Sequence, residues 1–230
     1  MDNLMLNNKI YLEGTILSEL EYSHEMYGEK FYTFDLEVMR LSDSKDKLNI
    51  TISERLISEY DLEVGKDIIV EGQLRSYNKF LGGNNKLILT VFARNIESCL
   101  ERSKNPNEIY LDGFICKDPI YRTTPFGREI ADVLLAVNRS YNKSDYIPTI
   151  AWGRNSRFCK SLEVGDNIRV WGRLQSREYQ KKISETEVIK KIAYEVSISK
   201  MEKVSDEEIA PDEAINDVVT EKVIISEEII

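Results

Sequence analysis

The chain carries two copies of one sequence unit, and this repeat limits what it can fold into more than any other feature. The segment 8–16, NKIYLEGTI, matches 107–115, NEIYLDGFI, at six of nine positions. Further on, 62–76, LEVGKDIIVEGQLRS, matches 162–176, LEVGDNIRVWGRLQS. Because the two pairs of blocks are collinear, we interpret the chain as a first copy (1–98), a polar linker, a second copy (107–203) and a tail (204–230).

Each copy predicts five short strands and one helix. Apolar residues alternate in 10–16 and in 109–115, which indicates strands with one buried face, and the glycine inside each indicates a bend. The other strands are expected at 31–40, 48–52, 67–75 and 86–96 in the first copy, and at 130–139, 149–152, 167–175 and 187–200 in the second. Short helices are expected at 54–60 and 155–162.

This order predicts an all-β protein made of two tandem OB-folds, which are five-stranded Greek-key barrels with a short helix between strands three and four. Five strands alone would also suit an SH3-like barrel, so the prediction depends on the place of the helix. The tail over 204–230 is acidic and poor in aromatic residues, and we expect it to be disordered.

The formal net charge of −9 is divided unevenly along the chain. Residues 8–98 hold 11 basic and 16 acidic side chains, a balance of −5, whereas 107–200 hold 16 and 12, a balance of +4. Residues 201–230 hold 2 basic and 10 acidic side chains, a balance of −8. A basic second copy suits a polyanionic partner, and an acidic tail suits a basic partner or the basic surface of the chain itself.

Several function classes find no support in the residues. The three cysteines are far apart and the only histidine, His24, lies in a polar stretch that we expect to be a surface loop, so no metal site or disulfide framework is predicted. Neither a phosphate-binding glycine motif nor a catalytic constellation is present, so we predict a protein that is not an enzyme and uses no cofactor. No apolar run approaches the ~18 residues of a membrane span, and we expect a cytoplasmic protein without a secretory signal.

The second copy combines aromatic and basic residues in a pattern typical of nucleic-acid binding. In the fourth strand, Arg169, Trp171 and Arg173 share one face, opposite the apolar residues. Further aromatic and basic residues alternate near strand ends, and they are Arg139, Tyr141, Lys143, Tyr146, Trp152, Arg154, Arg177 and Tyr179. Rings stack on bases of any sequence and cations contact phosphates, so this set predicts non-specific binding of single strands. A lone tryptophan in a barrel also suits the core or a subunit interface, and the arginines also suit a solvated face.

The same copy resembles bacterial single-stranded DNA-binding proteins over residues 107–200. The resemblance rests on TPFG at 124–127, LAVNRSY at 135–141, DYIP at 145–148, AWGR at 151–154 and GRLQSR at 172–177. It implies that Tyr141, Tyr146, Trp152 and Tyr179 stack bases, because these are the aromatic positions of the family. It also implies a homodimer with four OB-folds, and work in replication, recombination and repair at the nucleoid of a bacterial cytoplasm.

The first copy departs from this pattern. Its corresponding residues, approximately Ser42, Lys47, Ile52 and Lys79, are not aromatic, so we hypothesise that this copy is mainly structural. The acidic tail ends in two isoleucines, but it lacks the Pro-Phe ending with which the family recruits replication and repair proteins. Recruitment and simple solubilisation by the tail therefore remain equal interpretations.

Three functions stay open at this point. The first is binding of single-stranded DNA, which the aromatic positions favour. The second is a primosome-type OB protein whose main task is to dock other proteins, with weak binding of DNA or RNA, and the acidic first copy favours it. The third is an RNA-binding OB protein, because stacking and phosphate contacts are common to both nucleic acids.

Overall fold

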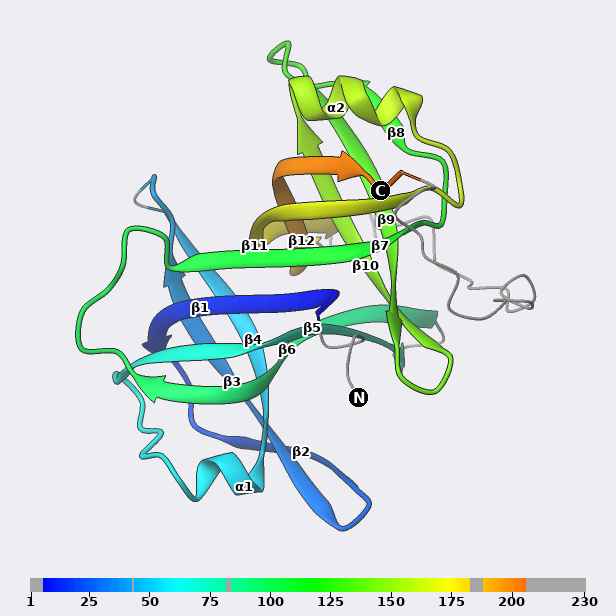
Figure 1. Cartoon of the computed structure of the whole chain (residues 1–230). Coiled ribbons are helices and arrows are strands. Elements are labelled where there is room, and N and C mark those ends of the chain that lie inside the picture. Colours follow the sequence, from blue (N-terminus) through cyan, green and yellow to red (C-terminus); the bar gives the residue numbers. More distant parts are fainter. Residues whose placement is uncertain (1–5, 43, 82–83, 183–187, 206–230) are drawn as a thin grey trace.

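The computed structural model describes residues 6–42, 44–81, 84–182 and 188–205, which fold into two similar β-structures (Figure 1). The first copy contains β1 (Asn8–Ile16), β2 (Glu21–Met26), β3 (Glu29–Met39), β4 (Lys45–Ser53), α1 (Glu54–Ile57), β5 (Asp67–Leu81) and β6 (Asn84–Ser98). The second copy contains β7 (Asn107–Ile115), β8 (Ile120–Thr123), β9 (Glu129–Arg139), β10 (Lys143–Trp152), α2 (Arg154–Phe158), a 3-10 turn (Cys159–Ser161), β11 (Asn167–Lys182) and β12 (Val188–Lys203). The helices α1 and α2 lie at opposite ends of the molecule.

Each copy closes a five-stranded barrel. Strand β1 pairs antiparallel with both β5 and β3, β3 pairs with β4, β4 runs parallel to β6, and β6 returns to β5. The second copy repeats this ring with β7, β9, β10, β12 and β11. The helix of each copy follows the third barrel strand, so the predicted all-β class and the two OB-folds are confirmed.

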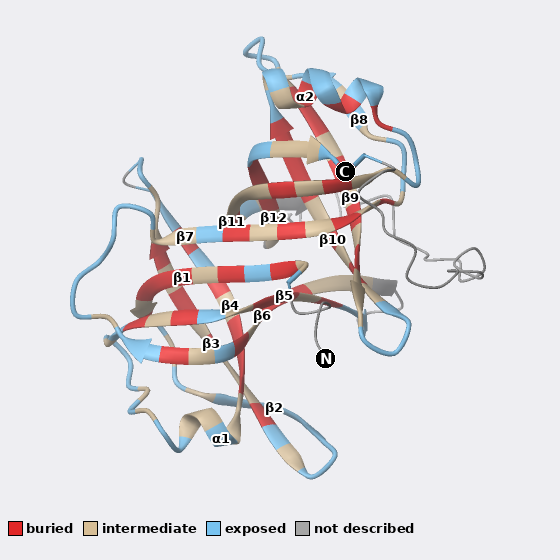
Figure 2. Ribbon diagram, in the orientation of Figure 1, coloured by how far each residue is buried: buried red, intermediate tan, exposed pale blue. Residues whose placement is uncertain are grey.

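The barrels are filled by alternate side chains of their strands, which appear as repeated buried bands along the ribbons in Figure 2. The largest fully buried side chains are apolar and come from both copies, and they include Phe34, Leu36, Ile50, Leu111 and Leu135. Gly14 lies where β1 leaves β5 for β3, and a Cβ there would stand 2.4 Å from the carbonyl oxygen of Glu37. The glycine at which a bend is predicted therefore stands where the two backbones approach closely.

The two barrels are joined edge to edge. Strands β1 and β7 pair antiparallel with Ile10 opposite Ile109, so one sheet runs from β5 through β1 and β7 to β11. Continuous hydrogen bonding across the joint removes the open edges that β1 and β7 would otherwise leave.

Several predictions about local structure were wrong or incomplete. Strand β10 begins at Lys143 and not at residue 149, and helix α1 ends at Ile57 and not at residue 60. A short strand that lies outside the barrel, β2 or β8, pairs with the next strand of each copy, so His24 lies in strand β2 and not in a loop. Every residue of β2 is exposed, which removes the apolar alternation that predicts a strand. Strands β5 and β11 also continue six or seven residues past their predicted ends, and pair only with β6 and β12 there. The pairing of these strands with β1 and β7 ends at residues 72 and 172, and we call the parts that follow, 73–81 and 173–182, the first arm and the second arm.

Candidate nucleic-acid interface

Two of the four predicted stacking residues lie on the outer face of β10. Ile147 and Ala151 are 0% exposed in the barrel core, and Asp145 on the same face of the strand is 0% exposed against the first copy, so the alternation of the strand turns Tyr146 and Trp152 the other way. The Trp152 side chain is 38% exposed, and Tyr146 is half-buried. Six residues of strand separate the two rings by roughly 20 Å, a length that accommodates several nucleotides.

Tyr141 stands at the tip of the turn between β9 and β10. It is 95% exposed and has a φ of 63°, in the left-handed region that non-glycine residues seldom occupy. Its neighbour Asn142 has a φ of 53°, so the tight reversal between Arg139 and Lys143 sets the backbone of both residues. The turn therefore presents the Tyr141 ring to solvent at the end of the strand that carries Tyr146.

Tyr179 lies on the second arm, opposite Lys191 on β12. It is half-buried and lines a hollow of about 70 Å³ together with Pro148 of β10 and Tyr194 of β12. Burial raises the pKa of the Tyr194 hydroxyl to about 12, so this group stays neutral. The other wall of the hollow comes from the first copy, at residues 86–89 of β6.

Trp171 belongs to a different surface from the other predicted aromatic residues. Its ring lies 5.3 Å from the Tyr110 ring of β7, and the Lys200 ammonium of β12 stands 4.1 Å from its centroid. Ile168 and Val170 are buried and Trp171 is half-buried, so the predicted alternation of this strand is confirmed. The structure places Trp171 on the outside of the sheet that joins the two barrels.

The predicted basic residues divide into three groups. Lys143, Arg154 and Arg177 are exposed, and the Arg177 guanidinium lies 6.0 Å from the Tyr179 ring. Arg139 and Arg169 contact carboxylates, since Arg139 donates to the buried Asp145 at 3.2 Å and Arg169 donates to Asp112 at 3.3 Å. Arg173 is half-buried, and its Nε has no hydrogen-bond partner among the described residues. The exposed group is the best placed to meet phosphates.

The strand registers correct one position of the first copy. In the second copy Trp152 pairs with Ile130. The counterpart of Ile130 in the first copy, at the repeat spacing of 99, is Phe31, and Phe31 pairs with Ser53. Ser53, rather than the fully buried Ile52, is therefore the counterpart of Trp152. The first copy still has no aromatic residue at the four positions. Elsewhere it has aromatic contacts of its own, with His24 stacked on Phe31 at 4.9 Å.

The residues that hold the two copies against one another were not among those predicted from the sequence. Asp46 and Asp145 are 0% exposed, and each accepts a hydrogen bond from a backbone N–H of the other copy, at Ser176 and Ser76 respectively. Both residue types recur at the repeat spacings of 99 and 100, which marks the positions but does not indicate that they contact one another. Within the described residues no cluster of three metal-ligating side chains occurs, and no helix is long and apolar enough to span a membrane.

Comparisons with known proteins agree with this geometry. The sequence model of the "Single-strand binding protein family" matches residues 106–204. "Single-stranded DNA-binding protein 1" of Staphylococcus aureus is 36% identical over 94 residues, which are 36% of this chain and 56% of that protein. "Single-stranded DNA-binding protein B" of Bacillus subtilis is 33% identical over 84 residues, which are 32% of this chain and 72% of that protein. The chain thus spans little more than half of the Staphylococcus relative.

One solved structure extends the similarity beyond the second copy. The wild-type single-stranded DNA binding protein from Thermus aquaticus superposes with a TM-score of 0.70 at 22% identity, covering 90% of this chain and 96% of that one. At this identity the match concerns the fold alone. It means that the arrangement of two joined barrels in one chain occurs in a protein of known structure.

Proposed function

The chain belongs to the single-strand binding protein family, and we propose that it binds single-stranded DNA without sequence specificity, to protect exposed strands in replication, recombination and repair. The observation that carries the proposal is the placement of four aromatic rings on the second copy, Tyr141 and Trp152 among them exposed. Their faces offer stacking platforms that every base can use, and such stacking contributes about 1–3 kcal/mol per base. The relatives named for this activity support the same conclusion.

The proposed mechanism divides the work between rings and cations. Tyr141, Tyr146, Trp152 and Tyr179 stack bases along β10 and the second arm, which leaves the sequence unread because stacking needs only a π face. The exposed Lys143, Arg154 and Arg177 pair with phosphates, so binding weakens as salt rises. A duplex keeps its bases paired and stacked, and therefore offers them less readily to the same rings.

The proposal is tested by fluorescence anisotropy of labelled oligo-dT, with the matching duplex and oligo-rU as competitors. We expect tight, salt-dependent binding of oligo-dT and weak binding of duplex. Tyr141→Ala should weaken binding by about 1–3 kcal/mol, whereas the matched Tyr22→Ala, 60% exposed in the first copy, should leave it unchanged. Equal effects of the two substitutions would contradict the assigned surface, and preference for oligo-rU would favour RNA as the ligand.

A second candidate function is protein docking with weak nucleic-acid binding. The hairpin of β2 and β3 favours it, because Tyr22, Met26 and Tyr27 are 60%, 50% and 100% exposed there. Micromolar binding of oligo-dT together with a stable protein complex would select this function over the first.

We further propose that two chains associate through the outer face of the joined sheet. Tyr11, Tyr110 and Trp171 are half-buried on this face, and a second copy would cover them and bring four OB-folds together. Light scattering should then give twice the chain mass of 26.7 kDa, and Tyr110→Glu should give the single mass. A monomer at micromolar concentration would reject the dimer.

The remaining proposals concern the tail and the location. We propose that the acidic tail recruits replication or repair proteins, although its residues from 206 onward lie outside the described part of the chain. Deleting 227–230 should abolish such contacts and leave oligo-dT binding intact, and unchanged capture of every replication partner would reject the role. We also propose that the protein works at the nucleoid of a bacterial cytoplasm, because single strands of DNA arise there during replication and repair.

A further inference from the structure

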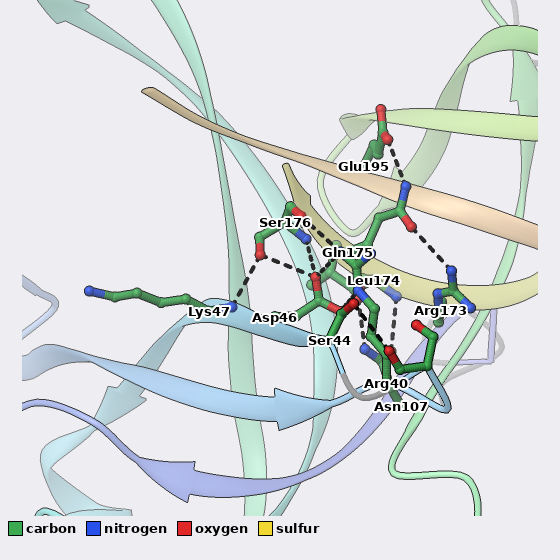
Figure 3. Close-up of polar contacts among 11 residues, drawn as sticks. Arg40, Ser44, Asp46, Lys47, Asn107, Arg173, Leu174, Gln175, Ser176 and Glu195 are labelled. Carbon is green, nitrogen blue, oxygen red and sulfur yellow. Dashed lines mark hydrogen bonds and ion pairs between the residues drawn. The ribbon is translucent and has the colours of Figure 1, made fainter. Parts of the chain in front are cut away.

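The second arm is held by the first copy at a buried carboxylate (Figure 3). The Asp46 side chain of β4 is 0% exposed, and its Oδ1 accepts hydrogen bonds from the Ser176 N–H at 2.6 Å and the Ser176 hydroxyl at 3.1 Å. Arg40 donates to both carboxylate oxygens, at 2.5 and 2.7 Å, and to the Ser176 carbonyl at 2.9 Å. The Lys47 N–H donates to the same hydroxyl at 3.1 Å. We call this set the Asp46 clasp.

The first arm is held by the second copy in the same way. Asp145 of β10 accepts hydrogen bonds from the Ser76 N–H at 2.6 Å, from Arg75 at 2.9 Å and from Arg139 at 3.2 Å. The Tyr146 N–H donates to the Ser76 hydroxyl at 2.7 Å. We call this second set the Asp145 clasp. Because buried charges are costly unless fully paired, the two clasps define one relative position of arm and barrel. The backbone of Tyr146 is therefore positioned by the first copy.

The hollow beside Tyr179 lies between the second arm with its partner β12 on one side and strand β6, the partner of the first arm, on the other. Its lining comprises Pro148, Tyr179 and 192–194 from the second copy, and Lys86 with 87–89 from the first. A volume of about 70 Å³ has room for roughly two waters, so a base would lie across the mouth of the hollow and not inside it. Lys86 is half-buried, and it is the one cationic side chain among the described residues that line this hollow.

We propose, on the premise of the proposed function, that the strand-binding surface is composite: a nucleotide stacked on Tyr179 of the second copy is contacted through its phosphate by Lys86 of the first. The apolar side chains 87–89 shield the stacked ring from water, and the two clasps keep the two walls in register. The first copy thus takes part in binding although it has lost the four stacking positions. Its role is to complete the subsite at Tyr179.

The test compares Lys86→Ala with Lys79→Ala in oligo-dT binding by the full chain. Lys79 is the matched control, because it pairs with Lys86 across the first arm and carries the same charge, yet does not line the hollow. We expect Lys86→Ala to weaken binding about two- to fivefold, as for loss of one exposed ion pair. It should also lower the slope of log affinity against log salt by about 0.7. Lys86→Arg should restore both values.

A double-mutant cycle with Tyr179→Ala identifies the shared nucleotide. If one nucleotide bridges both residues, the loss caused by Lys86→Ala should shrink when Tyr179 is already absent. Equal effects of Lys86→Ala and Lys79→Ala, with additive behaviour in the cycle, would overturn the composite subsite while leaving single-strand binding intact. Failure of the unmodified chain to bind oligo-dT would overturn the proposed function as well, so the two failures are distinguishable.

Discussion

Removing the Asp46 carboxylate should destabilise the fold by about 3 kcal/mol. The side chain is 0% exposed and accepts two hydrogen bonds from Ser176 and two from Arg40, all between 2.5 and 3.1 Å. Removing one partner of a buried pair typically costs about 3–5 kcal/mol, because the other charge loses its counter-ion. The Arg40 side chain is 23% exposed and can reach water, which places Asp46→Ala at the lower end of that range.

Urea denaturation followed by circular dichroism measures this effect, with Asp35→Ala as the control. Asp35 pairs with Lys47 at 2.8 Å, but the two side chains are 25% and 51% exposed, and such surface pairs contribute about 0–1 kcal/mol. Asp46→Ala should also weaken oligo-dT binding, because the arm that carries Tyr179 loses its anchor. A destabilisation within 1 kcal/mol of the Asp35 control would refute the argument that the clasp fixes the arm.

Three further predictions concern the second copy. Gly172→Ala should lower thermal stability by about 1–3 kcal/mol, since its Cβ would stand 2.2 Å from the carbonyl oxygen of Ser197, and an unchanged melting temperature would contradict this close approach. The hydrogen bond from Lys203 lowers the pKa of Asp166 below its usual 3.8, so its contribution to stability is present above that pH and is lost as the pH falls through the lowered pKa. Asp166→Asn should therefore destabilise the protein at pH 7 and progressively less as the pH falls below 3.8, and a pH-independent difference would speak against the ion pair. Burial raises the pKa of Cys159 to about 11, so on the order of one thiol in a thousand is ionised at pH 8, and alkylation should be slow until urea is added.

The repeat made the two barrels predictable. Alternation such as that of Ile10, Leu12 and Ile16 reports one buried face directly, and the helix after the third strand selects the OB order. The close approach of two backbones at Gly14 was also predictable, because a glycine inside an alternating strand usually marks a bulge or such an approach. These features depend on local pattern, and local pattern is what a sequence displays.

The features that depend on distant contacts were not predictable in the same way. The strand that carries His24 has no buried residue, so it shows no apolar alternation. The second arm leaves the barrel and pairs only with β12, so apolar alternation does not continue along it. Asp46 resembled a surface carboxylate, because nothing near it in sequence indicates Ser176, 130 residues away. The division of the arginines into exposed and paired groups likewise follows from partners such as Asp112, which only the fold brings near.

Tryptophan fluorescence during titration with oligo-dT tests the central claim most directly. The chain has two tryptophans, both in the second copy, so Trp171→Phe leaves Trp152 as the sole reporter at the proposed stacking surface. We expect strong quenching of this variant by oligo-dT, and little by duplex, because the 38% exposed ring would stack on a base. An unchanged emission while anisotropy records binding would contradict the claim that the second copy holds single strands by stacking on Trp152.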